Sequence, residues 1–266
     1  MASEPRVGVV VPVYNVEPYL QECLASIARQ SLRDLHVVMV DDGSTDASAE
    51  LARRFADEDP RFQLIRQANG GLGHARNVGA AAVRGEFLAF VDSDDVLPGH
   101  ALEILVETLE RTGSDFASGN VRLLTDGELV QSPMHRRPMG TTRLRTHVTR
   151  DHLLMYDRLV PNKLFRRRFW DEHGFRFPEG VLYEDIPVTL PAHFLASTVD
   201  VLGEPVYYWR QRTGEELSIT QRRTEIRAVT DRFSAVETVS RFLGSRPEPE
   251  VRACTRGYDE VALRSD

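Results

Sequence analysis

The sequence predicts an open α/β fold built around a mostly parallel β-sheet. Short apolar runs rich in β-branched residues alternate with amphipathic stretches through the first 92 residues. Such runs suit parallel strands that are buried on both faces, and the amphipathic stretches supply the helices that connect them. Polar residues gather directly after several of the runs, where an open α/β sheet binds its ligands. Together these three observations favour a ligand-binding α/β domain.

Each element of the first half follows from its local pattern. Apolar runs bounded by turn residues predict four strands, at residues 6–13, 35–42, 62–67 and 86–92. Amphipathic patterns predict three intervening helices, at residues 17–31, 46–59 and 74–84, and a further helix that begins near Pro98. Because parallel strands are joined by crossover helices, we expect the carboxyl ends of the four strands at one edge of the sheet.

The second half is less regular. A hairpin is expected around Asp126 and Gly127, then a basic, proline-rich loop from Ser132 to Arg145 and a helix from about Arg150. Residues 199–212 read as a strand. A last helix is expected from Thr224 to Leu243, with apolar residues largely at three- and four-residue intervals: Ile226, Val229, Phe233, Val236 and Phe242. This spacing predicts that these five side chains pack on the body of the domain.

The composition excludes several classes of function. With 266 residues, 41% hydrophobic content and a net charge of -7, the chain can fold as a globular domain and is too acidic for a nucleic-acid-binding surface. Its two cysteines, Cys23 and Cys254, lie far apart, which indicates neither a disulfide framework nor a zinc site and fits a reducing cytoplasm. No apolar run is long enough to span a membrane, so any membrane association is expected to be peripheral.

Three aspartates, Asp92, Asp94 and Asp95, follow the fourth predicted strand. Carboxylates this close repel one another unless a cation or hydrogen-bond donors lie between them. In an extended chain Asp92 and Asp94 project from the same side, and their oxygens suit Mg²⁺ or Mn²⁺ shared with a substrate diphosphate. A simpler alternative is that Asp94 or Asp95 caps the helix that begins near Pro98. The local pattern leaves both interpretations open.

A second polar cluster, VDDGSTD at residues 40–46, follows the second predicted strand. Asp46 or Thr45 can cap the helix that comes next, which explains part of the cluster without any ligand. Capping does not explain Asp41. A carboxylate at the carboxyl end of a strand can accept hydrogen bonds from the base or ribose of a nucleoside.

A third cluster, NGGLGHARN at residues 69–77, follows the third predicted strand. Its glycines suggest a dinucleotide-binding motif, but Arg76 stands where that motif needs its third glycine, so NAD binding is not indicated. We expect instead a flexible glycine turn that brings Asn69 and Arg76 to a ligand. A plain surface loop is the alternative.

Two clusters of the second half carry further candidates. In LYEDIP, residues 182–187, adjacent acids are typical of a solvated turn, but beside the aspartate site Asp185 could accept a proton from a hydroxyl group. Glu184 competes for that role, because neighbouring side chains of an extended segment point in opposite directions. Arg210 and Arg212, at the end of a predicted strand, can pair with a diphosphate, although exposed arginines are often only surface residues.

Six motifs, taken as an ordered set, closely resemble the family 2 glycosyltransferases of the GT-A fold over residues 6 to about 220. They are PVYNVEPYL, VDDGSTD, NGGLGHARN, FVDSDD, YEDIP and WRQR followed by a serine. The resemblance implies an inverting transfer of a sugar to an acceptor hydroxyl from a nucleoside diphosphate, usually UDP. It also implies residue roles. Asp185 would be the base, with Glu184 as the alternative, and Asp94, together with or replaced by Asp92, would bind Mn²⁺ or Mg²⁺. The nucleotide would contact Pro12, Val13, Tyr14, Asp41, Asn69, Arg76, Asp92 and Ser93, and the diphosphate Arg210, Arg212 and Ser218.

The same resemblance implies a domain organisation. We expect a GT-A domain over residues 1–245, with a nucleotide-sugar-binding half at 1–115, an acceptor half at 116–220 and a packing helix at 221–245. The RPEPE stretch interrupts the helical pattern. Residues 246–266 are therefore expected to be a linker and the start of a further domain.

A looser resemblance concerns the acceptor. Three segments are similar to the amino-terminal transferase domain of teichoic-acid-type proteins from high-GC bacteria: PNKLFRRRFW, YEDIPVTLPAHFLA and RQRTGEELSIT. That likeness implies a UDP-linked hexose or N-acetylhexosamine as donor. It implies a glycan, polyol-phosphate or lipid-linked acceptor of the cell wall, in the cytoplasm or at the inner face of the plasma membrane.

Two other classes of protein compete with an active transferase. A catalytically silent sugar-nucleotide or glycan-binding module would share the fold, since fold alone does not secure function. The joint presence of Asp92, Asp94 and Asp185 argues against it, because a binding module needs no base. A nucleotidyltransferase would typically have a glycine-rich, basic loop after the first strand, and PVYNVEPYL has no glycine there.

Overall fold

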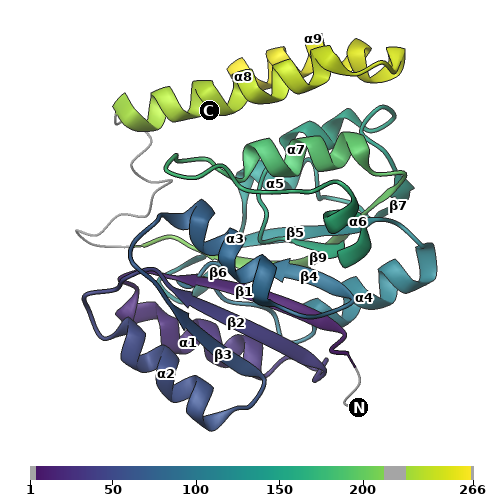
Figure 1. Cartoon of the computed structure of the whole chain (residues 1–266). Helices are drawn as coiled ribbons and strands as arrows, with labels where there is room; N and C mark the ends of the chain where they lie inside the picture. The colour runs from purple at the N-terminus through teal and green to yellow at the C-terminus, as the bar shows by residue number, and fades with distance from the viewer. Residues whose placement is uncertain (1–3, 213–225, 265–266) are drawn as a thin grey trace.

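The computed structural model of the protein describes residues 4–212 and 226–264, which form one nine-stranded sheet with helices on both faces (Figure 1). The strands are β1 Val7–Val13, β2 Leu35–Asp41, β3 Phe62–Arg66, β4 Phe87–Phe90, β5 Phe116–Thr125, β6 Glu128–Gln131, β7 Arg143–Thr146, β8 Lys163–Arg166 and β9 Val199–Arg210. The helices are α1 Glu17–Ala28, α2 Ser48–Glu58, α3 Leu72–Ala82, α4 Ala101–Thr112, α5 Pro133–Arg136, the 3₁₀ helix η1 His152–Tyr156, α6 Arg167–Glu172, α7 Ile186–Leu195, α8 Ile226–Ser245 and α9 Pro249–Arg264.

The strand order is β3-β2-β1-β4-β8-β5-β9-β7, with β6 paired to β5. The four strands of the first half are parallel to one another. Strand β8 runs antiparallel to both of its neighbours, β4 and β5, and β9 is parallel to β5. The predicted α/β fold with a mostly parallel open sheet is therefore confirmed, and β8 joins its two halves.

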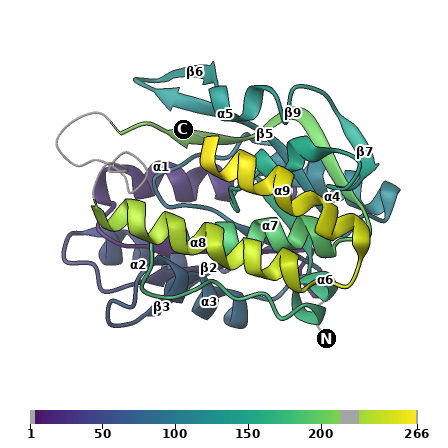
Figure 2. The same cartoon turned by 90° about the horizontal axis from the view of Figure 1, so that it is seen from above.

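The sheet separates two apolar layers. Alternate residues of β1 point to opposite faces, so Val9 and Val11 pack with α1, α2 and α4, while Val10 packs with α3, α6 and α7. This double burial explains why β1 is apolar at every position. Helices α8 and α9 lie side by side over α7 and form a further layer (Figures 1 and 2). Val239 of α8 and Tyr258 of α9 are fully buried in the cluster between them and α7.

The packing face predicted for α8 is wrong for three of its five residues, whereas Val236 and Phe242 pack against the body as expected. Ile226, Val229 and Phe233 have exposed fractions of 85%, 44% and 61%, and Val236 and Phe242 are only partly buried. The buried face consists mainly of smaller residues: Ala228, Ala235, Val239 and Leu243. Alanine at two of these positions lets α8 approach its neighbours closely, and the spacing of bulky residues does not reveal that face.

Other expectations for the second half are partly corrected. The hairpin at Asp126 and Gly127 is confirmed as the β5–β6 turn, with both residues at positive φ. The expected loop at residues 132–145 contains α5 and the first residues of β7, and the helix expected from Arg150 is the short 3₁₀ helix η1. Across residues 4–212 and 226–264 we find no helix with the length and apolar character of a membrane span.

Candidate active site

The carboxyl ends of β1, β2 and β4 lie side by side because these strands are parallel neighbours. Pro12 and Val13 are buried at the end of β1, and Tyr14, directly after it, is 48% exposed. Asp41 ends β2, and Asp92 follows β4. This edge of the sheet therefore combines an accessible aromatic ring with carboxylates from two strands.

Two consecutive aspartates at the end of β2 fix the neighbouring loops. Asp41 is fully buried, and its carboxylate accepts hydrogen bonds from Ser44 N–H at 3.1 Å and from Arg66 Nε at 3.0 Å. Asp42 accepts hydrogen bonds from the N–H groups of Gly70 and Gly71, at 2.9 and 2.8 Å. The sequence pattern does not distinguish Asp42, whose structural role is to hold the glycine turn that precedes α3.

The glycine turn at the start of α3 has a backbone conformation and a close packing contact that require glycine. Gly71 has a φ of +89°, a left-handed conformation that disfavours other residues. A Cβ at Gly73 would lie 2.2 Å from the carbonyl oxygen of Pro178, so glycine lets α3 approach this segment. The turn leaves Asn69 exposed and directs Arg76 inward.

Arg76 connects the aspartate loop with the YED segment. Its Nη1 donates to Glu184 Oε1 at 2.5 Å, its Nη2 donates to Asp92 Oδ1 at 2.6 Å, and the guanidinium lies 5.3 Å from the ring centroid of Phe177. Burial opposes the charge of Arg76, but the carboxylates of Asp92 and Glu184 raise its pKa above the ordinary value. In this state Arg76 positions two acids, and a contact with nucleotide stays a prediction.

The YED segment turns into α7 and is not extended as expected. Tyr183 has a φ of +61°, an unusual conformation for a residue with a side chain, and Asp185 lies at the N-cap of α7. Glu184 is buried and paired with Arg76. No lysine or arginine in the described part of the chain forms an ion pair of this kind with Asp185. Burial, and then the charge of Glu184, raises the pKa of Asp185 to about 7.

The aspartate loop also departs from the predicted geometry. Residues 92–95 form a turn in which Asp95 N–H donates to the carbonyl oxygen of Asp92 at 3.0 Å, so the chain is not extended here. The alternative in which Asp94 or Asp95 caps a helix is wrong, because α4 begins only at Ala101 and its N-cap, His100, makes no side-chain cap. Ser93 is buried within this turn.

Two arginines from the end of β9 reach the aspartate loop. Arg212 Nε donates to Asp94 Oδ2 at 2.8 Å, and Arg210 Nε donates to the carbonyl oxygen of Asp94 at 2.7 Å. Both guanidinium groups lie near the ring of Tyr19, at 5.1 Å for Arg212 and 5.3 Å for Arg210. Burial raises the pKa of Asp94, and the charge of Arg212 opposes that rise. Ser218, the third residue expected here, lies outside the described residues.

Asp92 and Asp94 fit a divalent cation by the chemistry of their side chains. Both offer carboxylate oxygens, which Mg²⁺ and Mn²⁺ bind together with water and substrate phosphates. The side chain of Asp92 is 31% exposed and that of Asp94 is 15% exposed, so neither is fully buried. Within the described residues, no group of three or more His, Cys, Asp or Glu side chains could hold an ion by itself. Two such ligands suit a cation that a diphosphate completes.

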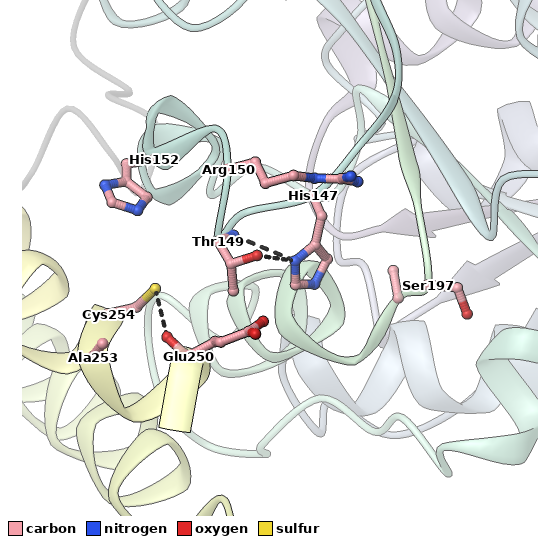
Figure 3. A pocket seen from close by; sticks show the side chains of 9 residues that line it. His147, Thr149, Arg150, His152, Ser197, Glu250, Ala253 and Cys254 are labelled. Atoms are coloured by element: carbon pink, nitrogen blue, oxygen red, sulfur yellow. Dashed lines mark hydrogen bonds between the residues drawn. The ribbon is translucent and has the colours of Figure 1, made fainter. Parts of the chain in front are cut away.

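A cavity of about 750 Å³ lies elsewhere, at the far end of α7 (Figure 3). It is lined by His147, Arg150, Ser197 and Glu250, among others, and by none of the residues predicted to form the site. The Thr149 hydroxyl and His147 Nδ1 share a hydrogen bond of 2.8 Å, and the backbone N–H of Thr149 donates to the same nitrogen at 3.3 Å, so that histidine is engaged by its neighbour. One helix of ten residues, roughly 15 Å long, separates this cavity from Asp185. We place the candidate active site at the strand ends, where acids and arginines converge.

Comparisons with known proteins identify the family and the fold. The sequence profile described as Glycosyl transferase family 2 matches residues 8–174. The chain is 34% identical over 215 residues to the uncharacterized glycosyltransferase EpsJ of Bacillus subtilis (strain 168). The aligned region covers 78% of this chain and 61% of that protein. It is 29% identical over 218 residues to the poly(ribitol-phosphate) beta-N-acetylglucosaminyltransferase TarS of Staphylococcus aureus (strain Mu50 / ATCC 700699), with 80% and 37% covered. The chain thus spans about three fifths or less of the length of these relatives.

Solved structures show the same architecture. The crystal structure of S. aureus TarS 1-349 in complex with UDP-GlcNAc matches with a TM-score of 0.80 at 25% identity, over 97% of this chain and 70% of that one. Mannosyltransferase PcManGT from Pyrobaculum calidifontis, in complex with GDP-Man and Mn²⁺, matches with a TM-score of 0.65 at 19% identity, over 99% and 71%. The second likeness concerns the fold alone.

The open sheet, with its acidic strand ends and its helices on both faces, is the GT-A fold of nucleotide-sugar-dependent glycosyltransferases. Within that class, the chain belongs to Glycosyl transferase family 2.

Proposed function

We propose that the chain transfers a hexose or N-acetylhexosamine, with inversion, from a UDP-sugar to an acceptor hydroxyl on a bacterial wall or surface polymer such as teichoic acid. One observation carries the proposal. Direct contacts join the aspartate loop to the YED segment through Arg76, and to the chain at and just after the end of β9 through Arg210 and Arg212. These contacts support a single site that combines a binding loop for a diphosphate with a candidate base.

The nucleotide is proposed to bind at the ends of β1 and β2. Tyr14 offers an accessible ring for the base, and Pro12 and Val13 precede it as buried residues of β1. Asp41, fully buried in this structure, is proposed to accept a hydrogen bond from uracil or ribose when the nucleotide binds. Each oxygen of Asp41 has one hydrogen bond in the structure and can accept another. Asn69 is exposed on the adjoining turn. TarS, a relative of this chain, has been solved in complex with UDP-GlcNAc, which supports UDP as the nucleotide.

Asp185 is proposed to act as the general base. Its carboxylate accepts the proton of the acceptor hydroxyl while that oxygen attacks the anomeric carbon from the side opposite the diphosphate. A pKa near 7 gives the best compromise between being deprotonated and being basic enough to take the proton. Glu184 is less suited to this role because Arg76 occupies its carboxylate. Inversion needs no covalent intermediate, so one base is sufficient.

The departing diphosphate gains negative charge, which the chain must stabilise. Arg210 and Arg212 stand beside the aspartate loop, and a guanidinium suits phosphate oxygens. Asp94, with Asp92, would hold Mn²⁺ or Mg²⁺, and such a cation, when bound, neutralises charge on the leaving group. Ser93 is proposed to contribute to the nucleotide side of the same loop.

The acceptor is proposed from the likeness to TarS, which is a poly(ribitol-phosphate) beta-N-acetylglucosaminyltransferase. A polyol-phosphate, a related glycan or a lipid-linked precursor would each present a hydroxyl to Asp185. We place the reaction in the cytoplasm or at the inner face of the plasma membrane. The silent binding module is disfavoured because such a module has no use for a partly buried carboxyl with a raised pKa.

The test is a screen for UDP release. Purified protein is incubated with Mn²⁺ and a panel of UDP-sugars, with and without crude wall polymer as acceptor. We expect acceptor-stimulated UDP release from at least one UDP-hexose or UDP-N-acetylhexosamine. Binding of UDP-sugars without release from any of them, with every acceptor tried, would favour the binding module instead.

A further inference from the structure

The hydroxyl of Tyr207 lies in the centre of the contact between β9 and the aspartate loop. It donates to Asp95 Oδ2 at 2.6 Å and accepts a hydrogen bond from the backbone N–H of Asp92 at 3.2 Å. Tyr207 is 1% exposed and Asp95 is 2% exposed. One buried hydroxyl therefore connects the first and last aspartates of the loop.

Asp95 completes the connection from the other side. Its second oxygen, Oδ1, accepts the backbone N–H of Arg210 at 2.6 Å, so one carboxylate binds two residues of β9. A buried carboxylate is stable only when its oxygens are hydrogen-bonded, and here both are. Asp95 is thus not a spare ligand of the aspartate loop, because both of its oxygens point to β9.

The backbone continues the same attachment. Val96 and Tyr208 exchange two backbone hydrogen bonds, of 3.1 and 2.9 Å, in an isolated antiparallel bridge. The loop is therefore attached to β9 both through the backbone and through the side chains of Asp95 and Tyr207. Asp92 and Asp94, whose carboxylates face the proposed donor site, lie directly before this attachment.

We propose that Tyr207 and Asp95 are positioning residues for the donor diphosphate and its cation. This inference rests on the proposed function. The two residues do not touch the donor; they hold the backbone of Asp92 and Asp94 in the conformation that presents both carboxylates to a shared cation. They also fix the end of β9, so Arg210 and Arg212 are held in register with the aspartates they face. Strand β9, which belongs to the acceptor half, thereby completes the donor site.

The alternative is that Tyr207 and Asp95 only stabilise the fold. A general loss of order would weaken every part of the nucleotide site, including the ends of β1 and β2, which lie on the other side of the aspartate loop. A positioning role affects only the part of donor affinity that depends on the cation. The two roles can therefore be separated by measuring UDP affinity with and without Mn²⁺.

The experiment uses calorimetric titration of UDP into the protein, with and without Mn²⁺. Tyr207→Phe removes only the hydroxyl. Its matched control is Tyr208→Phe, the next residue, which contacts the loop through its backbone. For Tyr207→Phe we expect the enhancement of UDP affinity by Mn²⁺ to fall by about tenfold or more, as for residues that orient metal ligands, and the metal-free affinity to stay within about threefold. The control should keep the enhancement of the unchanged protein.

A second variant, Asp95→Asn, keeps the size of the side chain and removes its charge, and it provides the same comparison if Tyr207→Phe does not fold. The double variant should lose no more of the Mn²⁺ enhancement than the single variant with the larger loss, because both changes break the same contact between Tyr207 and Asp95. Equal losses of metal-free and metal-dependent affinity, or an unchanged enhancement in both single variants, would overturn the positioning role. If the positioning role is overturned but the unchanged protein still releases UDP from a UDP-sugar, the proposed function stands. If the unchanged protein shows no Mn²⁺-dependent UDP binding, the proposed metal site fails, and this inference fails with it.

Discussion

Replacing Asp185 with asparagine is expected to remove catalysis and to leave donor binding nearly unchanged. Asparagine has the same size but cannot accept a proton from the acceptor hydroxyl. Loss of a general base lowers turnover by about 10²- to 10⁴-fold, which is about 3–5 kcal/mol of transition-state stabilisation. Because Asp185 lies at the N-cap of α7 and not in the aspartate loop, we expect the KM for the donor to change by only about threefold.

The pH dependence distinguishes Asp185 from its neighbour. Asp185 must be deprotonated to act, so with a pKa of about 7 the rate should rise with pH below 7, about tenfold per unit, and level off above it. The charge of Glu184 is one cause of the raised pKa. Glu184→Gln removes that charge and keeps an oxygen for Arg76, so the rise in rate should move to lower pH. In Asp185→Asn the rise should disappear.

The assay is UDP release from a saturating donor between about pH 5 and 9, for the unchanged protein and both variants. Circular dichroism at each pH checks that the variants remain folded. Normal turnover in Asp185→Asn, together with loss of the pH dependence in Glu184→Gln, would refute the assignment and move the base to Glu184.

Three further changes test other parts of the account. Asp94→Asn should abolish the enhancement of UDP binding by Mn²⁺, and metal-free affinity should be kept; an unchanged enhancement in a calorimetric titration would exclude Asp94 as a ligand. Lys163→Met should lower the free energy of unfolding by about 3–5 kcal/mol in urea denaturation, because the fully buried carboxylate of Asp157, now 2.8 Å from Lys163 Nζ, keeps only its contacts with Asn162 and His193 and loses the lysine charge; a loss below 1 kcal/mol would contradict this. Gly73→Ala should cost about 1–3 kcal/mol and raise the KM for the donor, because its Cβ would meet the Pro178 carbonyl oxygen at 2.2 Å; unchanged stability would show that the segment moves freely.

The first half of the fold could be predicted because its signals are local. The runs that become β1, β2 and β4 are apolar at successive positions, as expected for strands buried on both faces. Parallel pairing then places Asp41 and Asp92 at one edge without further information. The positions of these residues thus followed from pattern alone, whereas their contacts with ligands are still predictions.

The remaining features depend on contacts between distant parts of the chain. Asp95 meets Tyr207 across 112 positions of sequence, through a strand that enters the sheet after antiparallel β8, and no local pattern reveals this. Glu184 and Asp185 are adjacent and chemically alike, and only the position of Arg76 separates their environments. The buried face of α8 could not be predicted for another reason. Two of its residues are alanines, and alanine contributes little to an apolar spacing pattern.

An inverting transfer from a UDP-sugar determines the anomeric configuration of the product, and that configuration can be measured. The protein is incubated with Mn²⁺, the UDP-α-sugar that gives the fastest UDP release, and wall polymer or a polyol-phosphate fragment. Proton NMR then gives the anomeric coupling in the product. We expect a β-linked sugar, formed in the same amount as UDP. An α-linked product, or the absence of any glycosylated product with every donor, would contradict this expectation.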